Sequence, residues 1–260
     1  MKNNLLTVNV ITYNHKPYIA KCLDSLLEQK TDFGFIIRVF DDCSTDGTTE
    51  ICREYAEKYP NKIFFYPTEK NLGPTLNPLR SYKNIETPYY LYIEGDDYRI
   101  DKEGLKKQIH ALEKNPGCAF CAAKTINLYE GVFKDSHPNL KEGIYSNSYV
   151  YEHCQQYVYP NLGTRVVRTS CINLTQHPEN YLCDLSQFFE LLDTGDMYFI
   201  DEEYMVYRMT GSGESTGKNA CAMLAYIVNL AGKYCNKNDR SILNFLYILN
   251  VELLGAVERE

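Results

Sequence analysis

The sequence has no long apolar run, no surplus of positive charge and no tryptophan. A membrane-spanning helix needs about 20 consecutive apolar residues, and no stretch of this chain approaches that length. The formal net charge is −7 at pH 7, so the chain lacks the basic face that nucleic-acid binding requires. The N-terminus, MKNNLLTVNVITYN, carries polar residues throughout and lacks the apolar core of a signal peptide. These absences exclude a broad nucleic-acid binder and favour a cytoplasmic protein.

The cysteines and histidines show no pattern typical of a disulfide or zinc site. Ten cysteines are scattered over 260 residues, without the density of a small secreted domain. Cys118 and Cys121 form a CxxC, but no second pair stands at zinc-site spacing, so we expect both on a strand as reduced thiols. None of the five histidines has a persuasive partner in the sequence. We therefore expect all five at surface positions.

The first apolar run is not followed by a glycine-rich loop. Residues 5–13 have the composition of a buried strand, and the segment that ends it reads TYNHKPY. A dinucleotide-binding fold would place G-x-G-x-x-G there, so an oxidoreductase of the usual kind is disfavoured. A sugar-phosphate nucleotidyltransferase would need a glycine- and lysine-rich phosphate loop at the same place. That enzyme class remains an alternative, but its loop is missing.

Strands and helices alternate through the first hundred residues. The apolar spacing predicts strands at 5–13, 35–40, 63–66 and from 89, with helices at 19–27, from 48 and around 76–83. This alternation predicts an α/β fold with a doubly wound, mostly parallel sheet. Ligands of such sheets sit beyond the carboxyl ends of the strands. The functional site is therefore expected at that edge.

Carboxylates gather where the predicted strands end. The stretch YYLYIEGDD, residues 89–97, ends in Glu94, Asp96 and Asp97, and the strand at 35–40 is followed by Asp41 and Asp42. Three carboxylates in four residues repel one another, and a divalent cation with a preference for oxygen ligands, Mg²⁺ or Mn²⁺, resolves that repulsion. A glycine at position 95 removes side-chain bulk where a ligand must come close. A solvated acidic turn is the alternative.

The remainder of the chain predicts further elements and a helical tail. We expect a helix at 101–115 capped by Asp101, a strand at 118–129, irregular loops at 130–160, a short strand within 164–174, a helix from Asp184 and a strand at 197–209. Two amphipathic patterns follow at 220–234 and 241–257. Their apolar faces would pack against the core, form a dimer interface or attach to a membrane surface. These three alternatives stay open.

Four motifs follow one another in the sequence: TVNVITYNH, VFDDCSTDGT, NLGPTLN and YLYIEGDDY. Their order resembles that of inverting family-2 glycosyltransferases with the GT-A fold, and the resemblance extends over about residues 5–213. The resemblance implies a Rossmann-like, mostly parallel central sheet flanked by helices. Residues 1–100 would form its nucleotide-sugar-binding half, 101–213 its acceptor-binding and catalytic half, and 214–260 a C-terminal helical extension. EGDDY is similar to a bacterial variant of the family's D-x-D element.

The resemblance also implies a donor site for a nucleotide sugar, with a UDP-sugar favoured. Mn²⁺ or Mg²⁺ would be held by Asp96 and Glu94, with Asp97 as the alternative to Asp96. Asp42 matches the residue that hydrogen-bonds the base, and Arg208 matches one that reaches the diphosphate or braces the loop. The full implied donor-binding set is Thr12, Tyr13, Asn14, Asp42, Asn71, Arg80, Glu94, Asp96 and Arg208.

Asp184 matches the acid that opens a late helix and serves as general base in this family. A helix N-terminus favours an ionised carboxylate, although a simple capping role is the alternative. One general base and no protein nucleophile give a single displacement, hence inversion at the anomeric carbon.

The family often has a metal-binding histidine two residues beyond the position of Arg208, but here that residue is Thr210. A non-catalytic sugar-nucleotide-binding module in a larger assembly is therefore a further alternative.

The activity implied is sugar transfer to a hydroxyl of a glycan or lipid-linked acceptor, in bacterial capsule, lipopolysaccharide or other glycoconjugate synthesis. The expected location is the cytoplasm, or the inner face of the membrane if the C-terminal helices attach there.

Overall fold

The computed structural model describes residues 4–153, 159–172 and 184–209. They form one ten-stranded sheet in the order β3-β2-β1-β4-β9-β6-β10-β5, with β7 paired to β6 and β8 paired to β10. The longer pairings are parallel: β1 with β2 and β4, β2 with β3, and β6 with β10. The short strands β5, β7, β8 and β9 pair antiparallel. The predicted α/β fold with a mostly parallel central sheet is confirmed.

The first half follows the predicted alternation of strands and helices. Its elements are β1 (Asn4–Thr12), α1 (Ile19–Leu27), β2 (Gly34–Asp41), α2 (Thr48–Lys58), β3 (Ile63–Pro67), α3 (Gly73–Ser81) and β4 (Tyr89–Glu94). The helix expected at 76–83 begins three residues earlier. The reason is a capping contact, since the Asp42 carboxylate accepts hydrogen bonds from the backbone N–H groups of Leu72 and Gly73.

The second half contains more regular structure than its sequence predicts. Its elements are β5 (Tyr98–Arg99), α4 (Gly104–Lys114), β6 (Cys118–Tyr129), β7 (Val132–His137), β8 (Gly143–Tyr145), α5 (Asn147–His153), η2 (Leu162–Thr164), β9 (Val166–Arg168), η3 (Thr169–Cys171), α6 (Asp184–Thr194) and β10 (Asp196–Met209). The expectation of irregular loops at 130–160 is wrong, because β7, β8 and α5 lie there. Helix α4 begins three residues after Asp101, whose carboxylate instead accepts a hydrogen bond from the Glu103 backbone N–H.

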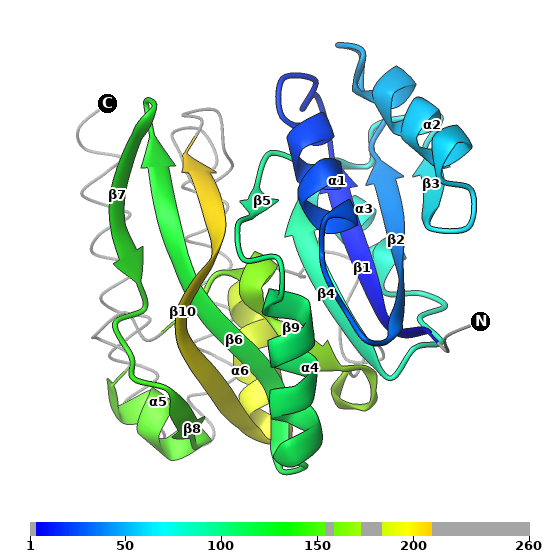
Figure 1. The fold of residues 1–260 in the computed structure, drawn as a ribbon. Helices are drawn as coiled ribbons and strands as arrows, with labels where there is room; N and C mark the ends of the chain where they lie inside the picture. The colour runs from blue at the N-terminus through cyan, green and yellow to red at the C-terminus, as the bar shows by residue number, and fades with distance from the viewer. Residues whose placement is uncertain (1–3, 154–158, 173–183, 210–260) are drawn as a thin grey trace.

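Helices cover both faces of the sheet (Figure 1), with α1 and α4 in front and α6 behind in that view. The strand β1 is buried along its last seven residues, as expected for a central strand covered on both sides. In α1 the buried positions Ile19, Cys22, Leu23 and Leu26 follow the helical period, so one face of that helix packs on the sheet. Cys118 and Cys121 are free thiols on β6, as predicted.

No helix in the described part of the chain is long and apolar enough to cross a membrane. The two helical patterns predicted at 220–234 and 241–257, and Thr210, lie outside the described residues.

Candidate active site

The ends of three parallel strands meet at one edge of the sheet. Thr12, the last residue of β1, pairs in register with Asp41 of β2, and Ile11 pairs with Glu94 of β4. This alignment brings the polar segments that follow β1, β2 and β4 together, although they lie far apart in the sequence. The edge is the one at which ligands bind in α/β sheets.

The acidic turn after β4 is packed tightly against β1. Its backbone is closed by a hydrogen bond from Asp97 N to Glu94 O at 3.1 Å and is joined to β1 by one from Gly95 N to Ile11 O at 2.8 Å. A Cβ at Gly95 would lie 2.9 Å from both Thr12 Oγ1 and Ile19 Cδ1. The glycine is therefore required by the approach of the protein's own side chains.

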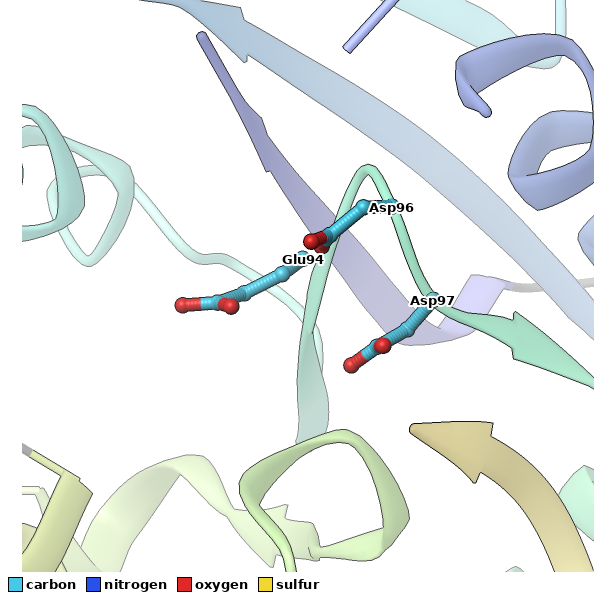
Figure 2. Close-up of side chains that lie close together, drawn as sticks. All are labelled: Glu94, Asp96 and Asp97. Atoms are coloured by element: carbon cyan, nitrogen blue, oxygen red, sulfur yellow. The ribbon is translucent and has the colours of Figure 1, made fainter. Parts of the chain in front are cut away.

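Three carboxylates extend from this turn to the same side (Figure 2). Glu94 is exposed, whereas Asp96 and Asp97 retain 9% and 2% of their accessible surface. Their ligand oxygens lie within 4.8 Å of one another, and the described residues contain no other such group able to hold a metal. Burial raises the pKa of Asp97 well above its usual value, and the neighbouring Asp96 and Glu94 charges raise it further.

Buried oxygen atoms at this turn support the fit of a divalent cation. Asp96 Oδ1 and Thr12 Oγ1 are buried and make no hydrogen bond with any described residue. A buried acceptor without a partner costs free energy, and a cation relieves that cost. Carboxylates are the ligands that Mg²⁺ and Mn²⁺ prefer. Glu94, Asp96 and Asp97 are thus the residues that would hold the ion.

The loop after β1 is fastened to the loop after β2. Asn14 has a positive φ of 53°. Its side-chain Oδ1 accepts a hydrogen bond from Thr45 N, and its backbone N–H donates to Ser44 Oγ, both at 2.9 Å. Thr12 is buried, and Tyr13 is 44% exposed at the edge. The structure places Thr12, Tyr13 and Asn14 at the end of β1, at the edge of the sheet where β2 and β4 also end, and their contact with a nucleoside stays a prediction.

Asp42 anchors the segment that leads into α3. Its Oδ1 accepts from Leu72 N at 2.7 Å and its Oδ2 from Gly73 N at 2.8 Å. Asp42 is 3% exposed, whereas Asn71, which directly precedes Leu72, is exposed. The Thr68 hydroxyl also donates to Asp42 Oδ1, at 3.4 Å. Any contact of Asp42 with a base would use the lone pairs that these three hydrogen bonds leave available.

The two predicted arginines differ in where their side chains lie. Arg80 donates from Nε to Asn77 Oδ1, and one terminal nitrogen donates to the backbone oxygens of Asp41 and Tyr66. These contacts join the ends of β2 and β3, and a phosphate contact for Arg80 stays a prediction. The Arg208 guanidinium lies over the rings of Tyr18 and Tyr98, at 5.0 and 4.9 Å from their centroids.

His15 is the functional candidate that the sequence missed. The expectation of a surface position is wrong for it, because its side chain is 24% exposed and its Nε2 lies 3.9 Å from Asp96 Oδ2. Burial lowers the pKa of His15, while the Asp96, Asp46 and Asp41 charges oppose that shift. The sequence signal that could have identified His15 is its position in TYNH, directly after the segment Thr12–Asn14.

The backbone of Asp184 begins α6, but its side chain lies outside the described residues, so its role as base stays a prediction. One turn further, Gln187 is buried and ties α6 to the core. Its Nε2 donates to the hydroxyl groups of Tyr82 and Tyr90, at 2.6 and 3.1 Å.

Comparisons with known proteins place the chain in one family. The family model described as "Glycosyl transferase family 2" matches residues 7–172. The poly(ribitol-phosphate) beta-N-acetylglucosaminyltransferase TarS of Staphylococcus aureus (strain Mu50) is 33% identical over 141 residues, which cover 52% of this chain and 24% of that relative. The match thus spans about a quarter of the length of TarS.

Two solved structures share the fold. The 1–349 segment of S. aureus TarS in complex with UDP-GlcNAc matches with a TM-score of 0.70 and 22% identity, covering 98% of this chain and 72% of that segment. A mannosyltransferase from Pyrobaculum calidifontis in complex with GDP-Man and Mn²⁺ matches with a TM-score of 0.65 and 14% identity, covering 97% and 72%. At these identities the likeness concerns the fold alone.

Proposed function

The chain belongs to glycosyltransferase family 2, and on that premise we propose that it transfers a sugar from a nucleotide-sugar donor to a hydroxyl of a glycan or lipid-linked acceptor. A UDP-sugar is the favoured donor, and bacterial surface polysaccharide or glycoconjugate synthesis is the favoured setting. The similarity to TarS, which by its name acts on poly(ribitol-phosphate), supports that setting. A lipid-linked acceptor would bring the protein to the inner face of the membrane, with segment 214–260 as the proposed contact for lipid or for a second copy.

The acidic turn at the edge of the sheet is the observation that carries this proposal. Its three carboxylates lie within 4.8 Å of one another, at the point where β1 and β2 also end. A bound Mn²⁺ or Mg²⁺ would stabilise the negative charge that develops on a diphosphate leaving group. Glu94, Asp96 and Asp97 would hold that ion. Two of these carboxylates are largely buried, so solvent and salt screen their charges less than they would at the surface.

The nucleoside would occupy the neighbouring strand ends. Tyr13 offers an exposed ring there, and Asp42 offers a carboxylate that two backbone N–H groups hold in place. Asn14 fixes the loop after β1 through Ser44 and Thr45, so this side of the site is preorganised. Asn71 lies directly before the segment that Asp42 anchors.

Asp184 is the proposed general base. A carboxylate at the first residue of α6 benefits from the helix dipole, which favours its ionised form. It would accept the proton of the acceptor hydroxyl as that oxygen attacks the anomeric carbon. Because the proposal includes no protein nucleophile, the displacement is single and inverts the anomeric configuration.

Calorimetric titration with UDP, GDP and CDP, each with and without Mn²⁺, tests the donor site. We expect UDP to bind most tightly and to require the metal ion. If GDP binds best instead, the site remains but the donor is a GDP-sugar. If none of the three binds, this chain on its own is not a nucleotide-sugar-dependent enzyme. UDP binding would justify a screen of UDP-sugars for slow hydrolysis and transfer.

A further inference from the structure

His15 faces the acidic turn without making a direct bond to it. The imidazole Nε2 lies 3.9 Å from Asp96 Oδ2, which is too long for a hydrogen bond. Polar atoms that face each other at this separation, with most of the surface of both side chains buried, suggest an atom bound between them. The two side chains come from different strand ends, β1 and β4, and converge on one point of the site.

The backbone around His15 holds the imidazole in this place. The His15 carbonyl oxygen accepts hydrogen bonds from Tyr18 N and Ile19 N, both at 2.9 Å, so the residue is fixed at the start of α1. Asn14 on one side is tied to the loop after β2, and Lys16 N on the other side donates to Asp46 Oδ2 at 3.0 Å. With both neighbours tethered, the imidazole is directed at the acidic turn before any ligand arrives.

Buried polar atoms around this contact have no partner among the residues described. They are His15 Nδ1, Asp96 Oδ1 and Thr12 Oγ1. Thr12 is 1% exposed and the Asp96 side chain 12% exposed. The two oxygen atoms point to a ligand rather than to ordinary packing, since buried polar atoms in native proteins are nearly always paired. His15 Nδ1 is directed away from Nε2, so it would not contact the same ligand.

The separation suits two ligands of one ion. Two ligand atoms that each lie about 2.1 Å from one cation can be at most about 4.2 Å apart, and the observed 3.9 Å is within that limit. We propose that His15 is a protein ligand of the metal ion, alongside Asp96, and that its nitrogen makes the site prefer Mn²⁺ over Mg²⁺. Mg²⁺ selects oxygen ligands more strictly than Mn²⁺ does. This inference rests on the metal-dependent donor site proposed above.

Titration of the protein with metal ions, with UDP present in excess, provides the test, with three variants beside the wild type. His15→Gln replaces the ring nitrogen by an amide that can offer oxygen, and His15→Ala removes the ligand. His110→Ala is the control, because His110 lies on α4 and pairs with Asp32 at 3.3 Å, half exposed. Circular dichroism establishes that each variant is folded before titration with Mn²⁺ and with Mg²⁺.

The expected result is a change in the ratio of the two metal affinities. In the wild type and in His110→Ala, Mn²⁺ binds about tenfold more tightly than Mg²⁺. In His15→Gln that preference falls to within about twofold, with Mg²⁺ binding retained, and His15→Ala loses Mn²⁺ affinity by about tenfold. Pulsed electron paramagnetic resonance of bound Mn²⁺ should show modulation from a histidine nitrogen in the wild type and in His110→Ala, and in neither His15 variant.

One outcome would overturn the inference and leave the proposed function standing. The wild type would bind UDP in a metal-dependent way, but its bound Mn²⁺ would show no nitrogen modulation, and His15→Gln would keep the wild-type ratio of Mn²⁺ to Mg²⁺ affinity. An equal loss of Mn²⁺ and Mg²⁺ affinity without nitrogen modulation would overturn it as well, because His15 would then act on the diphosphate. If the wild type binds neither UDP nor Mn²⁺, both proposals fail together.

Discussion

The carboxylate of Asp97 accepts a hydrogen bond from the backbone N–H of Arg208, with Asp97 Oδ1 2.9 Å from the nitrogen. This bond joins the acidic turn after β4 to the end of β10, two segments that lie 111 residues apart in the chain. The Arg208 guanidinium packs on Tyr98, in the strand that follows the turn. Asp97 therefore fixes the geometry of the turn as well as contributing charge to it.

Two substitutions of Asp97 separate these roles. Asp97→Asn keeps an oxygen that can accept the Arg208 N–H but removes a buried charge, so in the absence of metal the free energy of unfolding should change little or rise. Asp97→Ala leaves that N–H without its acceptor and should cost about 1 to 3 kcal/mol. Both variants should bind Mn²⁺ more weakly. Urea unfolding and Mn²⁺ titration provide the measurements, and equal stability of the two variants would contradict the anchoring role.

Asp42 is expected to support the fold even when no nucleotide is bound. Asp42→Ala removes the acceptor of both the Leu72 and Gly73 N–H groups and should lower the free energy of unfolding by about 2 to 4 kcal/mol. The exposed neighbour provides the control, since Asn71→Ala should cost less than about 0.5 kcal/mol. Urea denaturation of nucleotide-free protein distinguishes them. An unaltered midpoint for Asp42→Ala would mean that its carboxylate serves the ligand alone.

Lys62 should make stability depend on pH. Burial lowers the pKa of Lys62 to about 7 in the folded protein, where its Nζ donates to Phe35 O, whereas the unfolded chain titrates near 10.4. Between these values the unfolded state binds the extra proton, so the contribution of Lys62 to stability rises with pH from about 7 to 10.4. Urea midpoints from pH 7 to 9.5 should therefore rise more for the wild type than for Lys62→Met. Lys58→Met, which removes an exposed lysine at the end of α2, should keep the wild-type slope.

The first half of the fold was predictable because its signals are local. The helical spacing of Ile19 and Leu23, and the apolar run that ends at Thr12, identify α1 and β1 without reference to the rest of the chain. Parallel order then brings the strand ends together, and the register of Thr12 with Asp41 confirms it. The acidic turn was predictable for the same reason, as three carboxylates at a strand end need no tertiary information.

The features that were missed depend on distant partners. Strand β8 has three residues and pairs with β10, more than fifty residues later, so its own sequence gives little signal. Arg80 turns toward the Asp41 and Tyr66 carbonyl groups, which only the folded sheet brings within its reach. The position of His15 follows from the positive φ of Asn14 and the attachment of its loop to Ser44, which no periodicity encodes.

Gln187 should hold the first turn of α6 in place. Gln187→Met fills a similar volume but removes the donor to Tyr82 and Tyr90, so we expect a loss of about 1 to 2 kcal/mol in the free energy of unfolding. Tyr90→Phe, which removes only the longer bond, should cost about half as much. Thermal or urea unfolding measures both. If the two variants are as stable as the wild type, these bonds do not anchor the helix.

Asp184→Asn provides the strongest test of the proposed base, because the amide is nearly isosteric with the carboxylate but cannot take up the acceptor's proton. The rate of sugar transfer should fall by about 10² to 10⁴, while the dissociation constant for UDP should stay within about twofold. Asp193→Asn, an exposed position on the same helix, should keep the wild-type rate. A wild-type rate in Asp184→Asn would place the base elsewhere. If the wild type binds UDP but transfers no sugar to any acceptor tested, and Asp184→Asn binds UDP equally well, the chain is a sugar-nucleotide-binding module.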